Sequence, residues 1–140
     1  MKRLLLLLLI LPFISGCRSK QSQGDVIDMK LLIDNNEVNV TWVNNDSVKA
    51  LSNLVKDTLV INMHKYGDFE QTGSIGQSIT RNDTQMDVVP GDIVLYSGNA
   101  ISIFYDNSHW SYTRLGHINL SNSELNNLLN KSSVVATFKI

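Results

Sequence analysis

The stretch PGDIVLYSGNAISIFYD, residues 90–106, decides the fold. Its Pro-Gly pair is typical of a turn, and the apolar run 93–96 that follows predicts a strand. Residues 97–99 (Ser-Gly-Asn) reverse the chain, and residues 100–105 return as a second strand. This returning strand has apolar side chains on alternate positions and adds Phe104 on the opposite face. We therefore expect it to be buried on both faces and central in a sheet.

Further strands are predicted on both sides of this hairpin, because β-branched or alternating apolar runs recur along the chain. The turn formers Asp-Asn-Asn-Glu join the first two of these runs, which are expected to pair as a hairpin. The stretch 74–80 is expected to contribute a strand or an irregular edge. The predicted strands are 29–33, 38–42, 58–63, 112–118 and 133–140.

Two short helices interrupt the strands. Apolar residues at i, i+3, i+6 and i+7 predict an amphipathic helix over 46–56, with Leu51 buried. Ser121 and Glu124 have the spacing of a capping box and predict a second helix over 121–130. About eight strands with two helices indicate a mainly β barrel or rolled sheet.

The N-terminus has the features of an export signal. Lys2 and Arg3 precede an unbroken apolar run, Leu4–Leu11. This run is too short to cross a hydrocarbon core of ~30 Å but fits the apolar part of a signal peptide. It ends in Ile-Ser-Gly-Cys, residues 14–17. These residues resemble the bacterial lipobox, in which the cysteine thiol receives a diacylglyceryl group and the chain is cut just before it.

Three segments follow from this interpretation. Residues 1–16 are predicted to be a lipoprotein signal peptide, 17–25 a flexible tether starting at acylated Cys17, and 26–140 the folded domain. Acyl chains such as palmitate would anchor the protein to a membrane of a bacterial cell envelope, facing the periplasm or the exterior. The alternative is an ordinary secretory signal followed by a stray or buried thiol. Cys17 is the only cysteine, so its acylation would exclude disulfides and thiol catalysis.

The charge balance bears on possible partners. The 140 residues hold 12 Lys+Arg against 13 Asp+Glu, which gives a net charge of −1. Binding to nucleic acid depends on a basic face that neutralises phosphates, and this chain has no excess of basic residues. We therefore expect one domain and no nucleic-acid partner.

Three phrases in a fixed order resemble a bacterial family of cyclophilin-like domains. They are MHKYGDFEQTGSIGQSI at 63–79, the stretch at 90–106 already quoted, and WSYTRLGHI at 110–118. The resemblance runs from about residue 29 to the C-terminus. It implies a closed antiparallel β-barrel of about eight strands with a helix at each end.

The resemblance also raises prolyl isomerase activity, because the family is similar in fold to cyclophilin. Such enzymes place an Arg beside an apolar proline pocket, where donation to the proline nitrogen weakens amide resonance. The signatures Phe-His-Arg, Gln-Gly-Gly and Phe-Phe-Ile do not occur in this sequence. No catalytic residue is therefore assigned, and fold alone does not give function.

Four residues are candidates for a ligand cleft. Phe69, Tyr105 and Trp110 are aromatic and lie close to expected turns, where a ring with one wet edge often lines a cleft. The alternative for these three is core packing or capping of the barrel ends. Arg114 is the fourth candidate, as a donor to an anion or a carbonyl group.

Other charged residues have structural interpretations. Arg114 can instead form an ion pair with a carboxylate such as Glu70 or Asp92. Asp68 and Glu70 alternate in an extended stretch and are interpreted as solvated turn charges.

No metal or cofactor site is predicted. His64, His109 and His117 lack the spacing of paired ligands, and a zinc site needs a third protein ligand. The sequence contains neither a G-x-S-x-G elbow nor a P-loop.

Three hypotheses therefore remain. The first is a membrane-anchored module that binds a peptide or small ligand. The second is a prolyl isomerase with a divergent active site, and the third is a structural accessory lipoprotein. An enzyme is the less favoured interpretation, because the aromatic residues are present while the isomerase signatures are missing.

Overall fold

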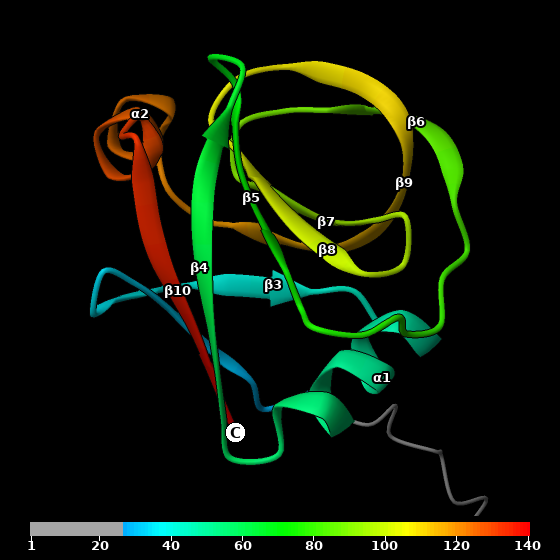
Figure 1. Ribbon diagram of the computed structural model, residues 1–140. Coiled ribbons are helices and arrows are strands. Elements are labelled where there is room, and N and C mark those ends of the chain that lie inside the picture. The colour runs from blue at the N-terminus through cyan, green and yellow to red at the C-terminus, as the bar shows by residue number, and fades with distance from the viewer. Residues whose placement is uncertain (1–26) are drawn as a thin grey trace, which may run out of the picture.

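The computed structural model describes residues 27–140, which form a ring of antiparallel strands with a helix at each end (Figure 1). The predicted segments 1–16 and 17–25, with Cys17, lie outside the described residues. Within 27–140 the elements are β1 (Lys30–Ile33), β2 (Asn36–Val38), β3 (Val40–Trp42), α1 (Asp46–Val55), β4 (Thr58–Tyr66), β5 (Glu70–Ser74), β6 (Thr84–Val88), β7 (Asp92–Tyr96), β8 (Ala100–Phe104), β9 (Ser108–Ile118), α2 (Asn122–Leu129) and β10 (Ser133–Lys139).

The barrel is nearly closed. The strand order is β2-β1-β10-β4-β5-β8-β7-β9-β3, and the two end strands are separated in sequence only by Asn39. The backbone N–H of Asn119, just after β9, donates to the carbonyl of Asn39 at 2.9 Å. The chain therefore passes from one end of the sheet to the other, and β2 and β3 together act as one wall. This confirms the predicted mainly β barrel of about eight strands with two helices.

The main core lies inside this ring and receives the inward faces of the strands and one side of each helix. Leu51 of α1 and Leu125 of α2 are fully buried, as are Phe138 and Ile103 from the strands. The burial of Leu51 confirms the predicted register of the first helix. Burying side chains of this size from water is the main source of stability in a domain of this length.

Hydrogen bonds of Asn45 hold the start of helix α1 against strand β9. The side chain of Asn45 caps it by accepting from the backbone N–H of Val48 at 2.8 Å. The same amide donates to the carbonyl of Arg114 in β9, also at 2.8 Å. Ser121 caps α2 by accepting from the N–H of Glu124, as the sequence predicts.

Three details of the strand prediction are wrong. Strand β5 occupies 70–74, where the sequence was interpreted as turn charges ahead of an edge over 74–80. The expected continuous strand 38–42 is divided at Asn39, because its first part pairs with β1 and its second part with β9. The sequence also did not predict β6. This strand pairs on one side only, with β9, and most of its side chains are exposed, so it lacks apolar alternation. The stretch 75–80, expected as a strand or an irregular edge, is irregular.

Strand β9 belongs to two sheets. Its first half, 108–112, pairs with β6, and its second half pairs with β7 and β3. Residues of β7 and β8 that point away from the main core then meet the first half of β9. They form a second, smaller apolar cluster of Val88, Val94, Phe104 and Tyr112, against which Phe69 and Met86 pack. The outer face of the wall β5-β8-β7 is therefore partly covered, and this cover creates the pocket described below.

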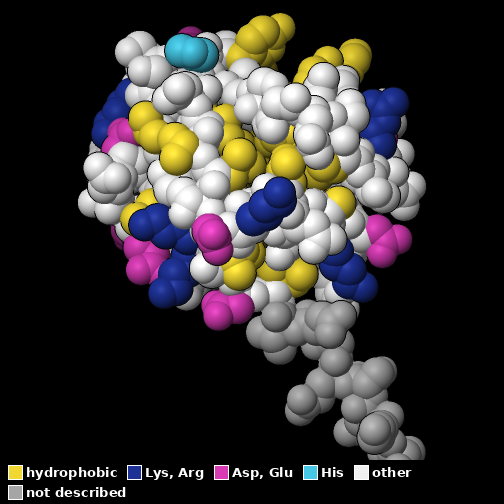
Figure 2. All heavy atoms as spheres, turned by 60° about the horizontal axis from the view of Figure 1, so that its bottom comes forward, with side chains coloured by type: hydrophobic (Ala, Val, Ile, Leu, Met, Phe, Trp, Pro, Cys, Tyr) yellow, Lys and Arg dark blue, Asp and Glu magenta, His cyan; other side chains and the backbone are white. Residues whose placement is uncertain are grey.

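The surface carries charges of both signs. Figure 2 shows Lys and Arg side chains scattered among Asp and Glu on the face turned toward the viewer, with apolar side chains between them. Neither sign gathers into an extended patch on this face. No helix within residues 27–140 has the length and apolar character needed to cross a membrane.

Candidate ligand pocket

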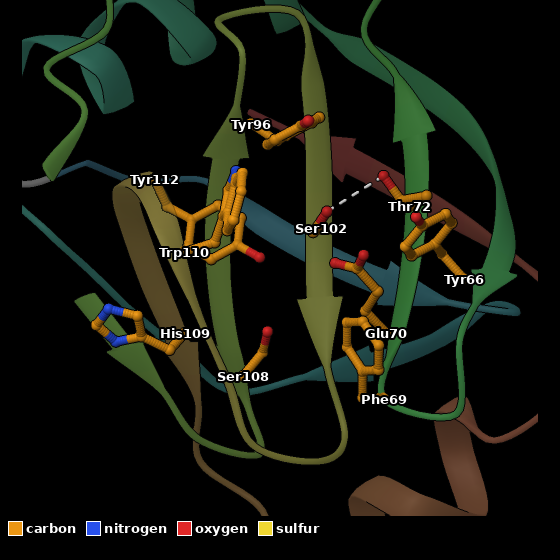
Figure 3. A pocket seen from close by; sticks show the side chains of 10 residues that line it. All are labelled: Tyr66, Phe69, Glu70, Thr72, Tyr96, Ser102, Ser108, His109, Trp110 and Tyr112. Atoms are coloured by element: carbon orange, nitrogen blue, oxygen red, sulfur yellow. Dashed lines mark hydrogen bonds between the residues drawn. The ribbon is translucent and has the colours of Figure 1, made fainter. Parts of the chain in front are cut away.

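A pocket of about 400 Å³ lies on the outer face of the wall β5-β8-β7, where the first half of β9 faces this wall (Figure 3). Its volume falls within the range of small-molecule sites, at the lower end of ~300–1,000 Å³. Five of its lining residues are aromatic, and none is Lys or Arg. The lining residues are Tyr66, Phe69, Glu70, Thr72, Tyr96, Ser102, Ser108, His109, Trp110 and Tyr112.

Aromatic contacts hold the walls in place. The ring of Phe69, in the turn between β4 and β5, stacks on Phe104 with centroids 6.3 Å apart and meets Tyr66 edge-on at 6.1 Å. Tyr112 meets Phe104 at 5.6 Å and Tyr96 at 6.2 Å, both edge-on. Ring pairs at these distances and tilts are favourable beyond the area that they bury. The pocket is therefore preformed on its two sides by one connected set of rings.

Trp110 differs from these rings because it is 58% exposed. It lies on β9 opposite Met86 of β6, and its indole side chain borders the pocket (Figure 3). A large ring left mostly in water offers apolar contact area and a face for stacking to anything that enters.

Glu70 supplies the only carboxyl group among the lining residues. Its side chain points into the middle of the pocket, between Ser102 and Phe69 (Figure 3). The residue is 7% exposed, and its Oε2 has no hydrogen-bond partner within the described part of the chain. Burial raises the pKa of Glu70 above its usual 4.5, and the Ser102 hydroxyl opposes that rise.

Polar groups around Glu70 are hydroxyls and one imidazole. The hydroxyls of Ser102 and Thr72 are hydrogen-bonded to each other at 3.2 Å. Burial raises the pKa of the Tyr112 phenol, and the nearby Glu70 carboxylate adds to that rise. His109 is exposed at the border of the pocket, where its Nδ1 lies 2.7 Å from Asp87 Oδ1. These groups can orient a ligand by hydrogen bonds without adding a fixed positive charge.

The structure brings together two of the four residues predicted for a cleft. Phe69 and Trp110 line the pocket on opposite sides. Tyr105 is 6% exposed and packs in the main core, as the alternative interpretation of core packing holds. Arg114 is not among the lining residues and points to a different set of partners.

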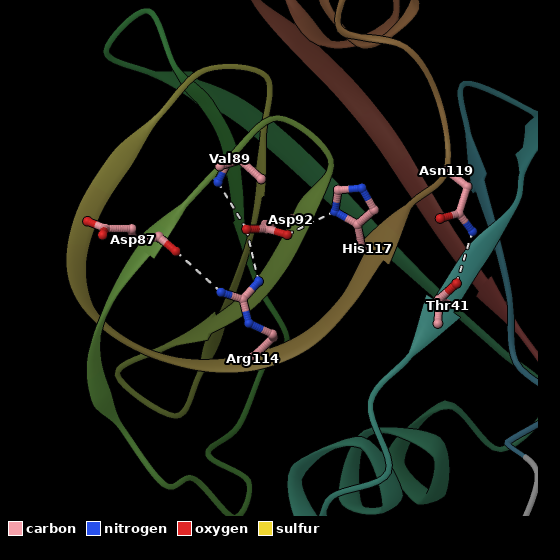
Figure 4. Close-up of polar contacts among 7 residues, drawn as sticks. All are labelled: Thr41, Asp87, Val89, Asp92, Arg114, His117 and Asn119. Atoms are coloured by element: carbon pink, nitrogen blue, oxygen red, sulfur yellow. Dashed lines mark hydrogen bonds and ion pairs between the residues drawn. The ribbon is translucent and has the colours of Figure 1, made fainter.

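Arg114 belongs to a polar network around Asp92 (Figure 4). Its Nη1 lies 2.9 Å from Asp92 Oδ2, and its Nη2 donates to the carbonyl of Asp87 at 3.3 Å. Asp92 also accepts from the backbone N–H of Val89 at 2.9 Å, and its other oxygen lies 2.9 Å from His117 Nδ1. Arg114 thus forms the ion pair with Asp92 that the sequence offered as an alternative.

Asp92 is held in its charged form by these partners. Burial alone would raise its pKa, but the Val89 N–H, Arg114 and His117 outweigh burial and lower the pKa below its usual 3.8. Both of its oxygens have partners, so the network holds the turn before β7 in place.

The interpretation of Glu70 as a solvated turn charge is wrong, whereas Asp68 is 98% exposed at its side chain as expected. Glu70 begins β5, and the first two residues of this strand are buried. Its neighbour Gln71 is fully buried on the other face, where its amide donates to the carbonyls of Leu129 and Lys131. Two adjacent polar residues buried on opposite faces leave no pattern that a sequence alone could reveal.

The His, Cys, Asp and Glu side chains of the described residues form no metal-binding cluster. Within 27–140 no three His, Cys, Asp or Glu side chains are placed to hold one metal ion. The hydrogen bonds of the same residues join His109 and His117 to carboxylates, while the Ser102 hydroxyl joins Thr72. A nucleophile next to a base, the usual arrangement for covalent catalysis, is therefore not seen in this pocket.

Comparisons with known proteins agree with the architecture. No curated protein matches the chain. The model of a family described as the cyclophilin-like family matches residues 31–139, which cover the barrel from β1 to β10. The chain therefore belongs to the cyclophilin-like family.

Proposed function

We propose that this protein is a bacterial membrane-anchored lipoprotein whose cyclophilin-like domain binds a peptide or small ligand in the aromatic pocket. The observation that carries the proposal is the pocket itself, about 400 Å³ in volume and lined by five aromatic residues. Binding sites typically combine such apolar walls with a few placed polar groups. Here those polar groups are Glu70, Thr72 and Ser102.

Binding without isomerisation is favoured over a divergent prolyl isomerase. Isomerisation of the cyclophilin type relies on an Arg that donates to the proline nitrogen. Arg114 is paired with Asp92 outside the pocket, and no Lys or Arg lines the pocket. The phenol of Tyr112 and the hydroxyl of Ser102 are weaker donors than a guanidinium group, so they do not replace it.

The binding proposal can be tested by NMR on the chain from which residues 1–16 have been removed, titrated with a short X-Pro peptide. We expect shifts at pocket residues that are lost in Trp110→Ala and kept in Val60→Ala, a variant of another exposed apolar residue outside the pocket. Exchange peaks between cis and trans proline that Trp110→Ala removes would instead support the isomerase. If the pocket residues respond to neither this peptide nor a set of small aromatic ligands, the accessory lipoprotein is the better proposal.

The anchor is supported by the lipobox-like residues 14–17, which precede the tether and the domain. Burial of two or more acyl chains gives stable membrane attachment, whereas one chain gives only reversible binding. We expect Cys17→Ser to move the protein from the membrane fraction to the soluble fraction when cells are fractionated. A variant that still sediments with membranes, with its signal removed, would contradict the lipoprotein proposal.

A further inference from the structure

The carboxyl group of Glu70 is buried in the pocket without enough partners for a charged group. The residue is more than nine-tenths buried, and Oε2 has no hydrogen-bond partner within the described residues. None of the ion pairs formed among residues 27–140 includes it. An unpaired buried carboxylate is costly unless something provides a donor or an opposite charge. The carboxyl group lies in the middle of a pocket that is open to a ligand (Figure 3), so a ligand that enters can supply what the protein does not.

We propose that the pocket takes an organic cation, with an ammonium or guanidinium group held by the Glu70 carboxylate and an apolar body held between the rings. The inference rests on the proposed function and names the class of ligand. Its basis is the position of Glu70 in the middle of the pocket, with Phe69 beside it and Trp110 on the opposite side (Figure 3).

The aromatic walls fit the same class of ligand. The faces of Trp and Tyr rings carry partial negative charge and attract an ammonium or guanidinium group within ~6 Å of the ring centre. Trp110, Tyr66 and Tyr96 are each more than two-fifths exposed, so their faces are available to a ligand. Desolvation inside a pocket strengthens both this attraction and the ion pair.

Anionic and neutral ligands fit less well. Lining residues include no Lys or Arg, and the one imidazole, His109, is already paired with Asp87 at the border. An anion would meet Glu70 without a compensating charge. A neutral ligand of the same shape would cover the pocket side of Glu70 without supplying a charge, so the buried carboxylate would stay unpaired.

The cation has two possible sources, a free small amine or the side chain of Lys or Arg in a peptide. The pocket volume of about 400 Å³ accommodates either one. Two pairs of probes distinguish them. Phenethylamine and its neutral isostere 2-phenylethanol represent the free amine, while Nα-acetyl-lysine amide and its Nε-acetylated form represent the side chain.

The experiment measures the affinity of each probe for the full chain in a non-ionic detergent, by the NMR shift of the Trp110 indole N–H. A mildly alkaline pH of about 8 is used because burial raises the pKa of Glu70 and a higher pH favours its carboxylate. In at least one pair, we expect the cation to bind about tenfold or more tightly than its isostere, since truncating a buried charge pair has effects of this size. Glu70→Gln should remove this preference.

Asp68→Asn is the matched control. Asp68 lies two residues away, and its side chain is 98% exposed and 3.6 Å from Lys65. It carries the same charge without facing the pocket, so its variant should keep the preference within about twofold. Equal loss of the preference in both variants would show a general surface-charge effect and overturn the inference.

The inference also fails if neither cation binds more tightly than its isostere, or if Glu70→Gln keeps the preference. Binding of the isosteres, followed by the backbone amide shifts of the other pocket residues and lost in Trp110→Ala, would then leave the proposed function standing while the cation is rejected. Absence of binding by all four probes rejects the cation, and the X-Pro titration then decides separately whether the pocket binds peptides.

Discussion

Two buried carboxylates lie on the two strands that flank β8, and their surroundings differ. Asp92 begins β7 and is 3% exposed, and both of its oxygens have partners. Glu70 begins β5 and is 7% exposed, but its Oε2 has none within residues 27–140. The same chemical group is therefore satisfied by the fold at one position and left incomplete at the other.

This difference separates a structural charge from a candidate binding charge. The partners of Asp92 lower its pKa, whereas burial raises the pKa of Glu70. A buried carboxylate without a partner lowers the stability of the fold, and an apolar side chain at the same position would avoid this loss. Stability alone therefore does not explain a glutamate at position 70. An incomplete charge in a preformed pocket is instead what a ligand-binding site would hold.

The largest expected effect on stability comes from Asp92→Ala. The variant leaves the Val89 N–H without its acceptor and deprives Arg114 and His117 of their carboxylate. Breaking a fully buried pair costs ~3–5 kcal/mol. Arg114 and His117 are about two-fifths exposed at their side chains and keep contact with water, so we expect a loss of about 2 kcal/mol in unfolding free energy. Urea denaturation at neutral pH measures this loss.

Asp92→Asn is the control for the loss of shape. It keeps one oxygen that can accept from the Val89 N–H but removes the charge. Its unfolding free energy should therefore lie between those of the wild type and Asp92→Ala. If both variants unfold with the free energy of the wild type, the network does not stabilise the fold.

The pH dependence of stability should have opposite signs at the two carboxylates. The folded-state pKa of Asp92 is lowered, so its stabilisation is complete above its usual pKa of 3.8 and is lost as the pH falls through the folded-state value. The folded-state pKa of Glu70 is raised, so its burial destabilises the fold progressively as the pH rises from 4.5 through the folded-state value.

Urea denaturation at a series of pH values separates the contributions of Asp92 and Glu70. Each variant is compared with the wild type at the same pH, so that the contributions of all other carboxylates cancel. The difference between the wild type and Asp92→Asn should shrink in acid. The difference between the wild type and Glu70→Gln should grow as the pH rises from 4.5. Parallel changes in both variants would mean that the two sites do not differ in charge as inferred.

The fold was largely predictable because its decisive residues act locally. The turn before β7 needs Gly91, whose φ is +96° and whose Cβ would lie 2.7 Å from the carbonyl oxygen of Ile118. The alternation of apolar residues in β8 and their spacing in α1 likewise indicate directly which side chains are buried. Strand β6 escaped prediction because it pairs on one side only, so its sequence carries no apolar period.

The site was only partly predictable. Phe69 and Trp110 were reached because aromatic residues near turns often border clefts. Glu70 was missed because the residues around it lie far along the sequence: it pairs with Phe104 of β8 and shares the pocket with Tyr112 of β9. The sequence shows which residues alternate on a strand, but it does not show which outer face of a barrel is covered.

Glu70→Gln should increase stability, in contrast to Asp92→Asn. The amide keeps the shape of the side chain and removes the charge that burial disfavours. We expect a gain of about 1 kcal/mol in unfolding free energy near pH 8 without ligand, measured by urea denaturation. A substantial loss instead would mean that Glu70 has a structural partner, and the comparison with Asp92 would fail.

The smallest effect on stability is expected from Arg114→Ala. This variant removes a partner of Asp92 while leaving Asp92 itself in place. Arg114 is one of three partners of Asp92, and its side chain is 38% exposed, so water replaces much of what it provides. Solvent-exposed ion pairs contribute little, and we expect a loss of about 0.5–1 kcal/mol in unfolding free energy. Because Arg114 does not line the pocket, ligand affinity measured by the Trp110 indole shift should stay within about twofold of the wild type. A tenfold loss of affinity with little loss of stability would reverse the assignment, since it would place Arg114 in ligand binding and leave Asp92 as its positioning residue.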